Sequence, residues 1–228
     1  MKILALDTSN QTLAVALVEN GRLQTEMTLA IKKNHSISLM PTIDFLMQSV
    51  GWKPADLERI VVAQGPGSYT GLRIGVATAK TLAYTLGIDL VGISSLQALL
   101  PADSKGLVVP LIDARRNHVY AGFYEQGQAV KADTYLSFEA LLEEVKNYEQ
   151  VTFVGEVAAF TEQIEAALPK VQYQATLPSA YQFALNGEHA PVSEVMSFEP
   201  RYLKRVEAEE NWLKNHEERD RESYIQRV

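Results

Sequence analysis

Residues 63–75 read AQGPGSYTGLRIG, a glycine-rich turn that joins an apolar run to a helical pattern starting at Gly71. Strand, glycine turn and helix start in series are typical of a place where backbone N–H groups face an anion or another backbone. A Walker A nucleotide loop is excluded, because G-x-x-x-x-G-K-[ST] needs lysine after its last glycine and here Leu72 and Arg73 follow Gly71. The stretch therefore predicts a strand–turn–helix unit of an α/β fold. A tight turn that binds no ligand is the plainer alternative to a site that faces an anion or another backbone.

The composition restricts the classes of protein to which the chain can belong. The 228 residues suffice for one large core or two small ones. The formal charge of −7 argues against a free-standing nucleic-acid binder, and the absence of cysteine excludes disulfides and thiolate metal ligands. Met1-Lys2 leads directly into a strand pattern and no window is apolar enough to span a membrane, so we expect a cytoplasmic protein without a signal peptide or membrane contact.

A faint internal repeat relates the two halves of the chain. Asp7 matches Asp113, and the hairpin pair Asn20-Gly21 matches Gln126-Gly127, with similar apolar segments between them. Each half therefore predicts a strand ending in aspartate, a second strand, a hairpin turn, a third strand and a helix, followed by a further strand and helix.

The repeat predicts two lobes, residues 1–102 and 103–203, with helices of the second lobe from about Ser137 and over 157–168. The charge-dense segment 204–228 is predicted to be a C-terminal helix docked by a narrow apolar stripe. Two such lobes resemble the duplicated α/β architecture shared by actin, sugar kinases and heat-shock chaperones. In that superfamily two Asp-bearing hairpins face each other across a cleft and hold nucleotide phosphates.

Four blocks of the sequence resemble the bacterial TsaB (YeaZ) family. They occur in the family's order across almost the whole chain and comprise Ile3–Ser9, Gly65–Gly75 with Ala79-Lys80, Ile112–Arg116 with Val119-Tyr120, and Pro200–Leu203. The glycine block is the most specific of them. The resemblance implies a subunit of the machinery that puts threonylcarbamoyl on the adenosine next to the anticodon of certain tRNAs.

The resemblance also implies the partners and the lack of an active site. Family members pair with a catalytic relative, TsaD, and with an ATPase subunit, TsaE, so the chain is expected to reach tRNA only through that complex. The catalytic relative holds a metal through an H-x-x-x-H pair, and Ser95 and Leu99 stand at those two positions here. Neither side chain replaces imidazole as a ligand, so we expect no bound metal and a non-catalytic subunit of a family once named glycoprotease-like.

The nucleotide site that the superfamily implies is predicted to be vestigial, with the residues Asp7, Thr8, Ser9 and Asp113. Arg115 and the turn 155–157 put bulky or acidic groups where phosphate and adenosine need small or neutral neighbours. We expect no tightly bound cofactor, with ATP and Mg²⁺ at an interface shared with the partner as the alternative. An ATP-dependent phosphotransferase is the first rival function. A peptidase is the second, although H-E-x-x-H and G-x-S-x-G motifs are both missing.

Two helices are predicted to form the partner surface. The helix over 36–50 has an apolar stripe for the core and a second apolar stripe on the opposite side. The helix that starts at Gly71 has a ridge of small residues (Gly71, Gly75, Ala79, Ala83), and mostly larger side chains lie on its other side. The residues expected to contact the partner are Ile37, Pro41, Phe45, Arg73, Ala77, Lys80 and Tyr84, with Met40 and Met47 as adaptable neighbours. The alternative is that the small-residue ridge packs on the chain's own sheet. When alone, the chain is expected to form a homodimer through the same surface.

Overall fold

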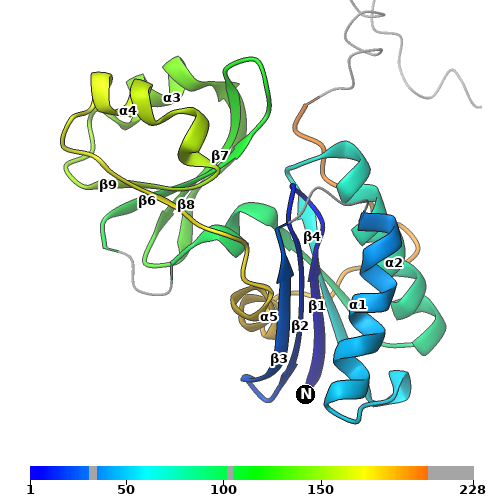
Figure 1. Ribbon diagram of the computed structural model, residues 1–228. Helices are drawn as coiled ribbons and strands as arrows, with labels where there is room; N and C mark the ends of the chain where they lie inside the picture. Colours follow the sequence, from blue (N-terminus) through cyan, green and yellow to red (C-terminus); the bar gives the residue numbers. More distant parts are fainter. Residues whose placement is uncertain (31–34, 102–104, 205–228) are drawn as a thin grey trace, which may run out of the picture.

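The computed structural model describes residues 1–30, 35–101 and 105–204, which form two five-stranded sheets (Figure 1). The first sheet has the order β3-β2-β1-β4-β5 and the second the order β10-β9-β6-β7-β8. The strands are β1 (Lys2–Asp7), β2 (Leu13–Glu19), β3 (Arg22–Leu29), β4 (Arg59–Gly65), β5 (Asp89–Ser94), β6 (Leu107–Asp113), β7 (His118–Glu125), β8 (Gln128–Ser137), β9 (Val151–Gly155) and β10 (Gln172–Ala175).

The two sheets repeat one topology. β1 pairs antiparallel with β2 and parallel with β4, and β6 pairs antiparallel with β7 and parallel with β9. Both hairpins turn through a positive-φ residue followed by glycine: Asn20 and Gly21 have φ of 50° and 73°, and Gln126 and Gly127 have φ of 50° and 76°. The predicted duplication is confirmed, including the aspartates that end β1 and β6.

Helices cover both faces of the first sheet. α1 (His35–Ser49) and α2 (Tyr69–Leu86) pack on the face to which Leu4 and Leu6 point, whereas α5 (Ala180–Glu188) packs on the opposite face, with Ile3 and Ala5 (Figure 1). Because side chains alternate along a strand, consecutive residues of β1 supply the two cores in turn. β1 is therefore buried from both sides.

The larger core of the second sheet lies on the side of α3 (Phe138–Val145) and α4 (Thr161–Ala167), and a smaller apolar cluster covers its other face. The start predicted at Ser137 is confirmed, because the Ser137 hydroxyl caps α3 by accepting from the Ala140 N–H. The helix predicted over 157–168 is interrupted. A 3₁₀ turn, Val157–Ala159, precedes α4, and Phe160 leaves the helical region at φ −121° as its ring stacks on Phe138 at 4.3 Å.

The structure differs from the predicted range 103–203 of the second lobe. α5 and the chain after it as far as Phe198 return to the first sheet. There the Arg59 guanidinium donates to the Gly187 carbonyl at 3.0 Å, and a Cβ on Gly187 would meet Val61 at 2.4 Å. The physical reason is that the outer face of β1 and β2 is apolar and needs a cover, which the repeat in sequence does not supply. The predicted helical tail lies outside the described residues, apart from Lys204.

Within residues 1–30, 35–101 and 105–204, no helix combines the length and the apolar character that crossing a membrane requires.

Candidate functional site

The glycine block packs against the loop that follows β1. A Cβ on Gly71 would lie 2.1 Å from the Thr8 carbonyl oxygen, and one on Gly67 would lie 2.2 Å from the Ser9 carbonyl oxygen. Ser68 caps α2 through its hydroxyl, and its own N–H donates to the Ser9 carbonyl at 2.6 Å. The sequence left open whether this turn faces an anion or another backbone, and the structure shows the close approach of another backbone. The helix that was predicted to start at Gly71 begins at Tyr69.

Asp7 is fully buried at the end of β1. One carboxylate oxygen accepts from the Ser9 N–H at 2.7 Å, while Oδ2 has no hydrogen-bond partner among the described residues. Burial raises the pKa of Asp7 to about 6, against the opposing effects of the Ser9 hydrogen bonds and of nearby His35. Asp7 therefore lies behind the cleft described below and is not among the residues that line it, and its vestigial role stays a prediction.

The raised pKa of Asp7 predicts an unusual pH dependence of stability. Because the folded state holds this proton more tightly than the unfolded state, protonation of Asp7 stabilises the fold as pH falls through 6, and this contribution is lost as pH rises above 6. Asp7→Asn should remove that effect. Between pH 7 and pH 5 the free energy of unfolding of the wild type should rise relative to the variant by about 1 kcal/mol.

Urea titrations of both proteins at the two pH values measure this difference, because the other titrating groups are common to both and cancel. An equal response of wild type and Asp7→Asn to pH would show that Asp7 is ionised at neutral pH without penalty.

The second aspartate is held by its own hairpin. Asp113 accepts from the Arg115 N–H at 2.7 Å and from its guanidinium at 3.0 Å, and the Asp113 N–H donates to Glu156 at 2.9 Å. Arg115, Arg116 and Asn117 all have positive φ, from 54° to 69°, so the turn between β6 and β7 is tightly wound. Burial raises the pKa of Glu156, against the opposing hydrogen bond from the Asp113 N–H and the charge of Arg115, while the charges of Asp113 and Asp7 add to the rise.

The loops of both lobes line a cleft of about 360 Å³. The first lobe contributes residues 9–11 and 67–69, and the second contributes residues 112–115 with Tyr120 and Glu156; Lys204 also lines the cleft. Polar groups in and behind this lining are already paired, or carry negative charge. The Thr8 hydroxyl donates to the Gly71 carbonyl at 2.7 Å, Asp113 is paired with Arg115, and Glu156 adds a carboxylate to the lining.

The two positions that the resemblance matched to metal ligands, Ser95 and Leu99, are buried. Ser95 and Leu99 belong to a 3₁₀ helix, Ser95–Leu99, which begins after the hydroxyl cap of Ser94. Leu99 joins the apolar cluster beneath the second sheet, with Ile112 and Tyr124. Among the residues that the structure describes, no group of three or more His, Asp or Glu side chains is arranged to hold a metal ion.

The outer faces of α1 and α2 are exposed, with Ile37, Phe45 and Tyr84 at 72%, 59% and 69% of full exposure. Pro41, Arg73 and Ala77 are exposed beside them, and Lys80 is half-buried. The prediction that Met47 is an adaptable neighbour of the partner surface is wrong, because its side chain is buried in the core. The ridge of small residues on α2 is buried on the chain's own sheet, as the alternative predicted.

Comparison with known proteins places these features in a family. Residues 27–217 match the family model described as "TsaD: tRNA N6-adenosine threonylcarbamoyltransferase". The tRNA threonylcarbamoyladenosine biosynthesis protein TsaB of Bacillus subtilis is 37% identical over 227 residues, which cover 94% of this chain and 99% of that protein. The chain belongs to the TsaB (YeaZ) family.

Solved structures agree with this membership. YeaZ from Pseudomonas aeruginosa superimposes with a TM-score of 0.75 at 26% identity, over 89% of this chain and 99% of that one. The activator of 2-hydroxyisocaproyl-CoA dehydratase from Clostridium difficile, solved with bound ADPNP, reaches 0.52 at 10% identity over 96% and 100% of the two chains. The second likeness shows only that the TsaB family shares its fold with a nucleotide-binding protein.

One feature of this TsaB-family chain escaped the sequence analysis, namely the path of the segment 193–204. Its Pro200–Leu203 block supported the resemblance to the family, but its neighbours were not predicted. The Arg201 N–H donates to the Gln64 carbonyl at 2.7 Å, and the guanidinium forms an ion pair with Asp133 of the second sheet. A Cβ on Gly65 would lie 2.3 Å from the Arg201 carbonyl oxygen. The glycine that ends β4 is therefore the one sequence feature that indicates the close approach of the segment 193–204 to this strand.

Proposed function

We propose that the chain is the non-catalytic partner of a TsaD-type subunit in the biosynthesis of threonylcarbamoyladenosine in tRNA. It would position and activate that subunit together with a TsaE-type ATPase. Contact with tRNA would come only through the complex. The family membership supports the pathway, and the name of the matching family model supports the choice of partner.

The observation that carries the partner role is the exposed apolar face of α1 and α2. Each helix buries one side on the first sheet, and Ile37, Phe45 and Tyr84 project from the other side. Large apolar side chains that gather on one face of a folded protein mark interaction sites, and aromatic side chains dominate the energetics of such sites. The face therefore fits a helix–helix interface better than a solvated surface.

The lining of the cleft favours this role over an ATP-dependent phosphotransferase. Because Asp7 is buried and Arg115 and Glu156 line the cleft, we expect weak binding of Mg-ATP by the isolated chain. Calorimetry is the test, and a dissociation constant in the low micromolar range, about −8 kcal/mol, would favour the phosphotransferase instead. ATP with Mg²⁺ at an interface shared with the partner is a separate proposal, tested by repeating the titration with the assembled pair.

The decisive experiment for the function is reconstitution. We expect the purified chain to co-elute with its TsaD-type subunit and to restore threonylcarbamoylation of tRNA when the ATPase subunit is added. Omission of the chain should abolish the product, and the chain by itself should form none. Product formed equally well without the chain would contradict the activating role.

A further inference from the structure

The exposed large apolar side chains of the described residues are unevenly distributed. Besides those of α1 and α2, two belong to the C-terminal segment that runs beside α2, namely Met196 and Tyr202. The whole group comprises Ile37, Met40, Phe45, Tyr69, Tyr84, Met196 and Tyr202. The segment Ser193–Lys204, here called the strap, is thus a candidate third element of the same face.

Three contacts place the strap alongside α2. The Lys80 ammonium donates to the Met196 carbonyl at 2.6 Å and to the Phe198 carbonyl at 3.3 Å, and the Tyr202 ring stacks on Tyr69 with 4.7 Å between ring centroids. Lys80 lies C-terminal to Tyr69 on α2, while Met196 precedes Tyr202, so the strap runs antiparallel to the helix. Figure 1 shows this segment in orange beside α2.

These contacts change the role expected of Lys80. Its ammonium group is occupied by backbone carbonyls of the strap, so it holds the strap on α2 instead of offering a free charge to a partner. Arg73 lies near the start of α2, where Tyr202 of the strap stacks on Tyr69, and its guanidinium is 4.9 Å from the centroid of the Tyr69 ring. Tyrosine and arginine side chains that are already ordered in this way lose little conformational entropy when a partner covers them.

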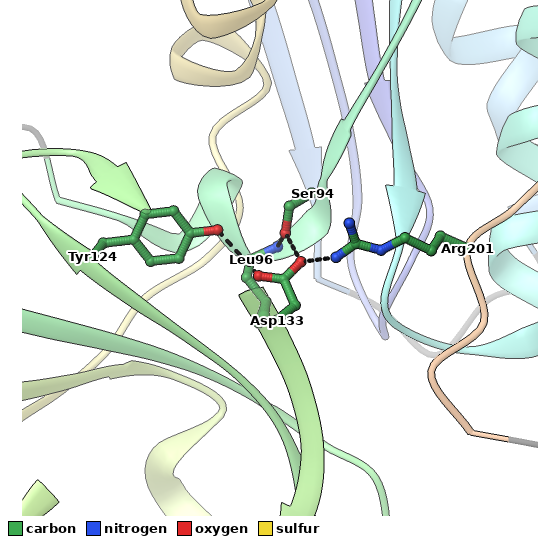
Figure 2. Close-up of polar contacts among 5 residues, drawn as sticks. All are labelled: Ser94, Leu96, Tyr124, Asp133 and Arg201. Atoms are coloured by element: carbon green, nitrogen blue, oxygen red, sulfur yellow. Dashed lines mark hydrogen bonds and ion pairs between the residues drawn. The ribbon is translucent and has the colours of Figure 1, made fainter. Parts of the chain in front are cut away.

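A carboxylate from the other lobe fixes the far end of the strap (Figure 2). Asp133 of β8 has a side chain only 4% exposed, and it accepts from the Ser94 hydroxyl at 2.7 Å and from the Tyr124 hydroxyl at 3.3 Å, besides its ion pair with Arg201. The group joins β5 of the first sheet, β7 and β8 of the second sheet, and the strap. The second lobe therefore holds Arg201 in place. Tyr202 is the next residue of the chain, so its position is restrained by the same contacts.

We propose that the strap is the third element of the partner-binding face, with Tyr202 as a contact residue and Asp133 as a positioning residue that acts through Arg201. This inference rests on the proposed function, and the occupant is the TsaD-type subunit, which would meet the strap with an apolar surface. The contacts of the strap with α2 support it. Tyr69 and Lys80 hold the strap against this helix, so the exposed side chains of Met196 and Tyr202 extend the apolar surface that the helix presents.

The test compares the affinities of four variants for the TsaD-type subunit with that of the wild type. Tyr202→Ala should weaken binding at least about tenfold, and Tyr202→Phe, which keeps the ring, should restore it to within about twofold. Tyr148→Ala is the matched control, because Tyr148 is a similarly exposed tyrosine of the second lobe, away from the strap. Asp133→Asn should weaken binding several-fold without touching the face itself.

Hydrogen exchange of the strap amides separates positioning from general destabilisation. In the free chain, Asp133→Asn should speed exchange at residues 201–203 while exchange in β1 and β4 stays unchanged, and binding of the partner to the wild type should slow exchange along the strap. Normal affinity of both Tyr202→Ala and Asp133→Asn, with a loss confined to variants of α1 and α2, would overturn the inference and leave the proposed function intact. Failure of the wild type to bind the TsaD-type subunit would overturn both.

Discussion

Replacing Phe45 with aspartate should weaken binding of the TsaD-type subunit by at least about 2 kcal/mol, a loss of affinity of about 30-fold. Phe45 is 59% exposed on the outer side of α1, between Pro41 and the C-terminal end of the helix. A carboxylate at this place would be desolvated by an apolar partner, and the residues of α1 that follow Phe45 supply no basic side chain to pair with it. The measurement is a titration of the catalytic subunit against both chains.

The fold should survive this substitution, since the core of α1 is made by the opposite stripe, Leu39, Ile43 and Leu46. Thermal melts of wild type and Phe45→Asp should therefore agree closely, and Tyr148→Asp, on the second lobe, serves as the control for an added charge at an exposed ring. A lowered melting temperature would assign Phe45 to the core. Unchanged affinity would remove Phe45 from the interface.

The same substitution addresses the homodimer. If the isolated chain self-associates through α1 and α2, Phe45→Asp should make it monomeric, because a two-fold interface presents the new charge twice. Addition of the TsaD-type subunit to the wild type should dissolve the homodimer, since both assemblies would use one face. Sedimentation velocity with increasing amounts of the catalytic subunit distinguishes a displaced homodimer from a larger assembly that retains it.

The parts of the fold that could be predicted from sequence are those set by local backbone chemistry. Asn20-Gly21 and Gln126-Gly127 each require positive φ at consecutive positions, and that requirement leaves few alternatives to a hairpin. The two stripes of α1 likewise separate into a buried and an exposed side because helical periodicity fixes their directions. Neither inference needed knowledge of distant neighbours.

The parts that could not be predicted depend on pairs far apart in the chain. Asp133 and Arg201 are 68 residues apart, and Lys80 and Met196 are 116 residues apart. No periodic pattern in the sequence predicts either contact. Lys80 on the outer side of a helix has the same sequence signature whether it meets a partner protein or the chain's own carbonyls. Physical proximity, which sequence spacing does not encode, decides between these roles, and the strap was missed for that reason.

The glycine block gives the second prediction of large effect. Gly71→Ala should destabilise the fold by about 3 kcal/mol or more, although alanine is the better helix former by about 1 kcal/mol. The new methyl group would lie 2.1 Å from the Thr8 carbonyl oxygen, and neither backbone can move without separating α2 from β1. Chemical denaturation of wild type and variant measures the loss.

A neighbouring glycine of α2 supplies the matched comparison. On Gly75, a Cβ would lie 2.5 Å from the Thr8 hydroxyl oxygen, which belongs to a side chain, so Gly75→Ala should be the milder change. Thr8→Ala should recover part of the loss in Gly75→Ala, because it removes the atom in the way, and should recover none in Gly71→Ala, because the carbonyl stays. Equal stability of Gly71→Ala and wild type would mean that the loop after β1 does not rest on α2 in solution. The two-backbone contact would then no longer explain why the block is so rich in glycine.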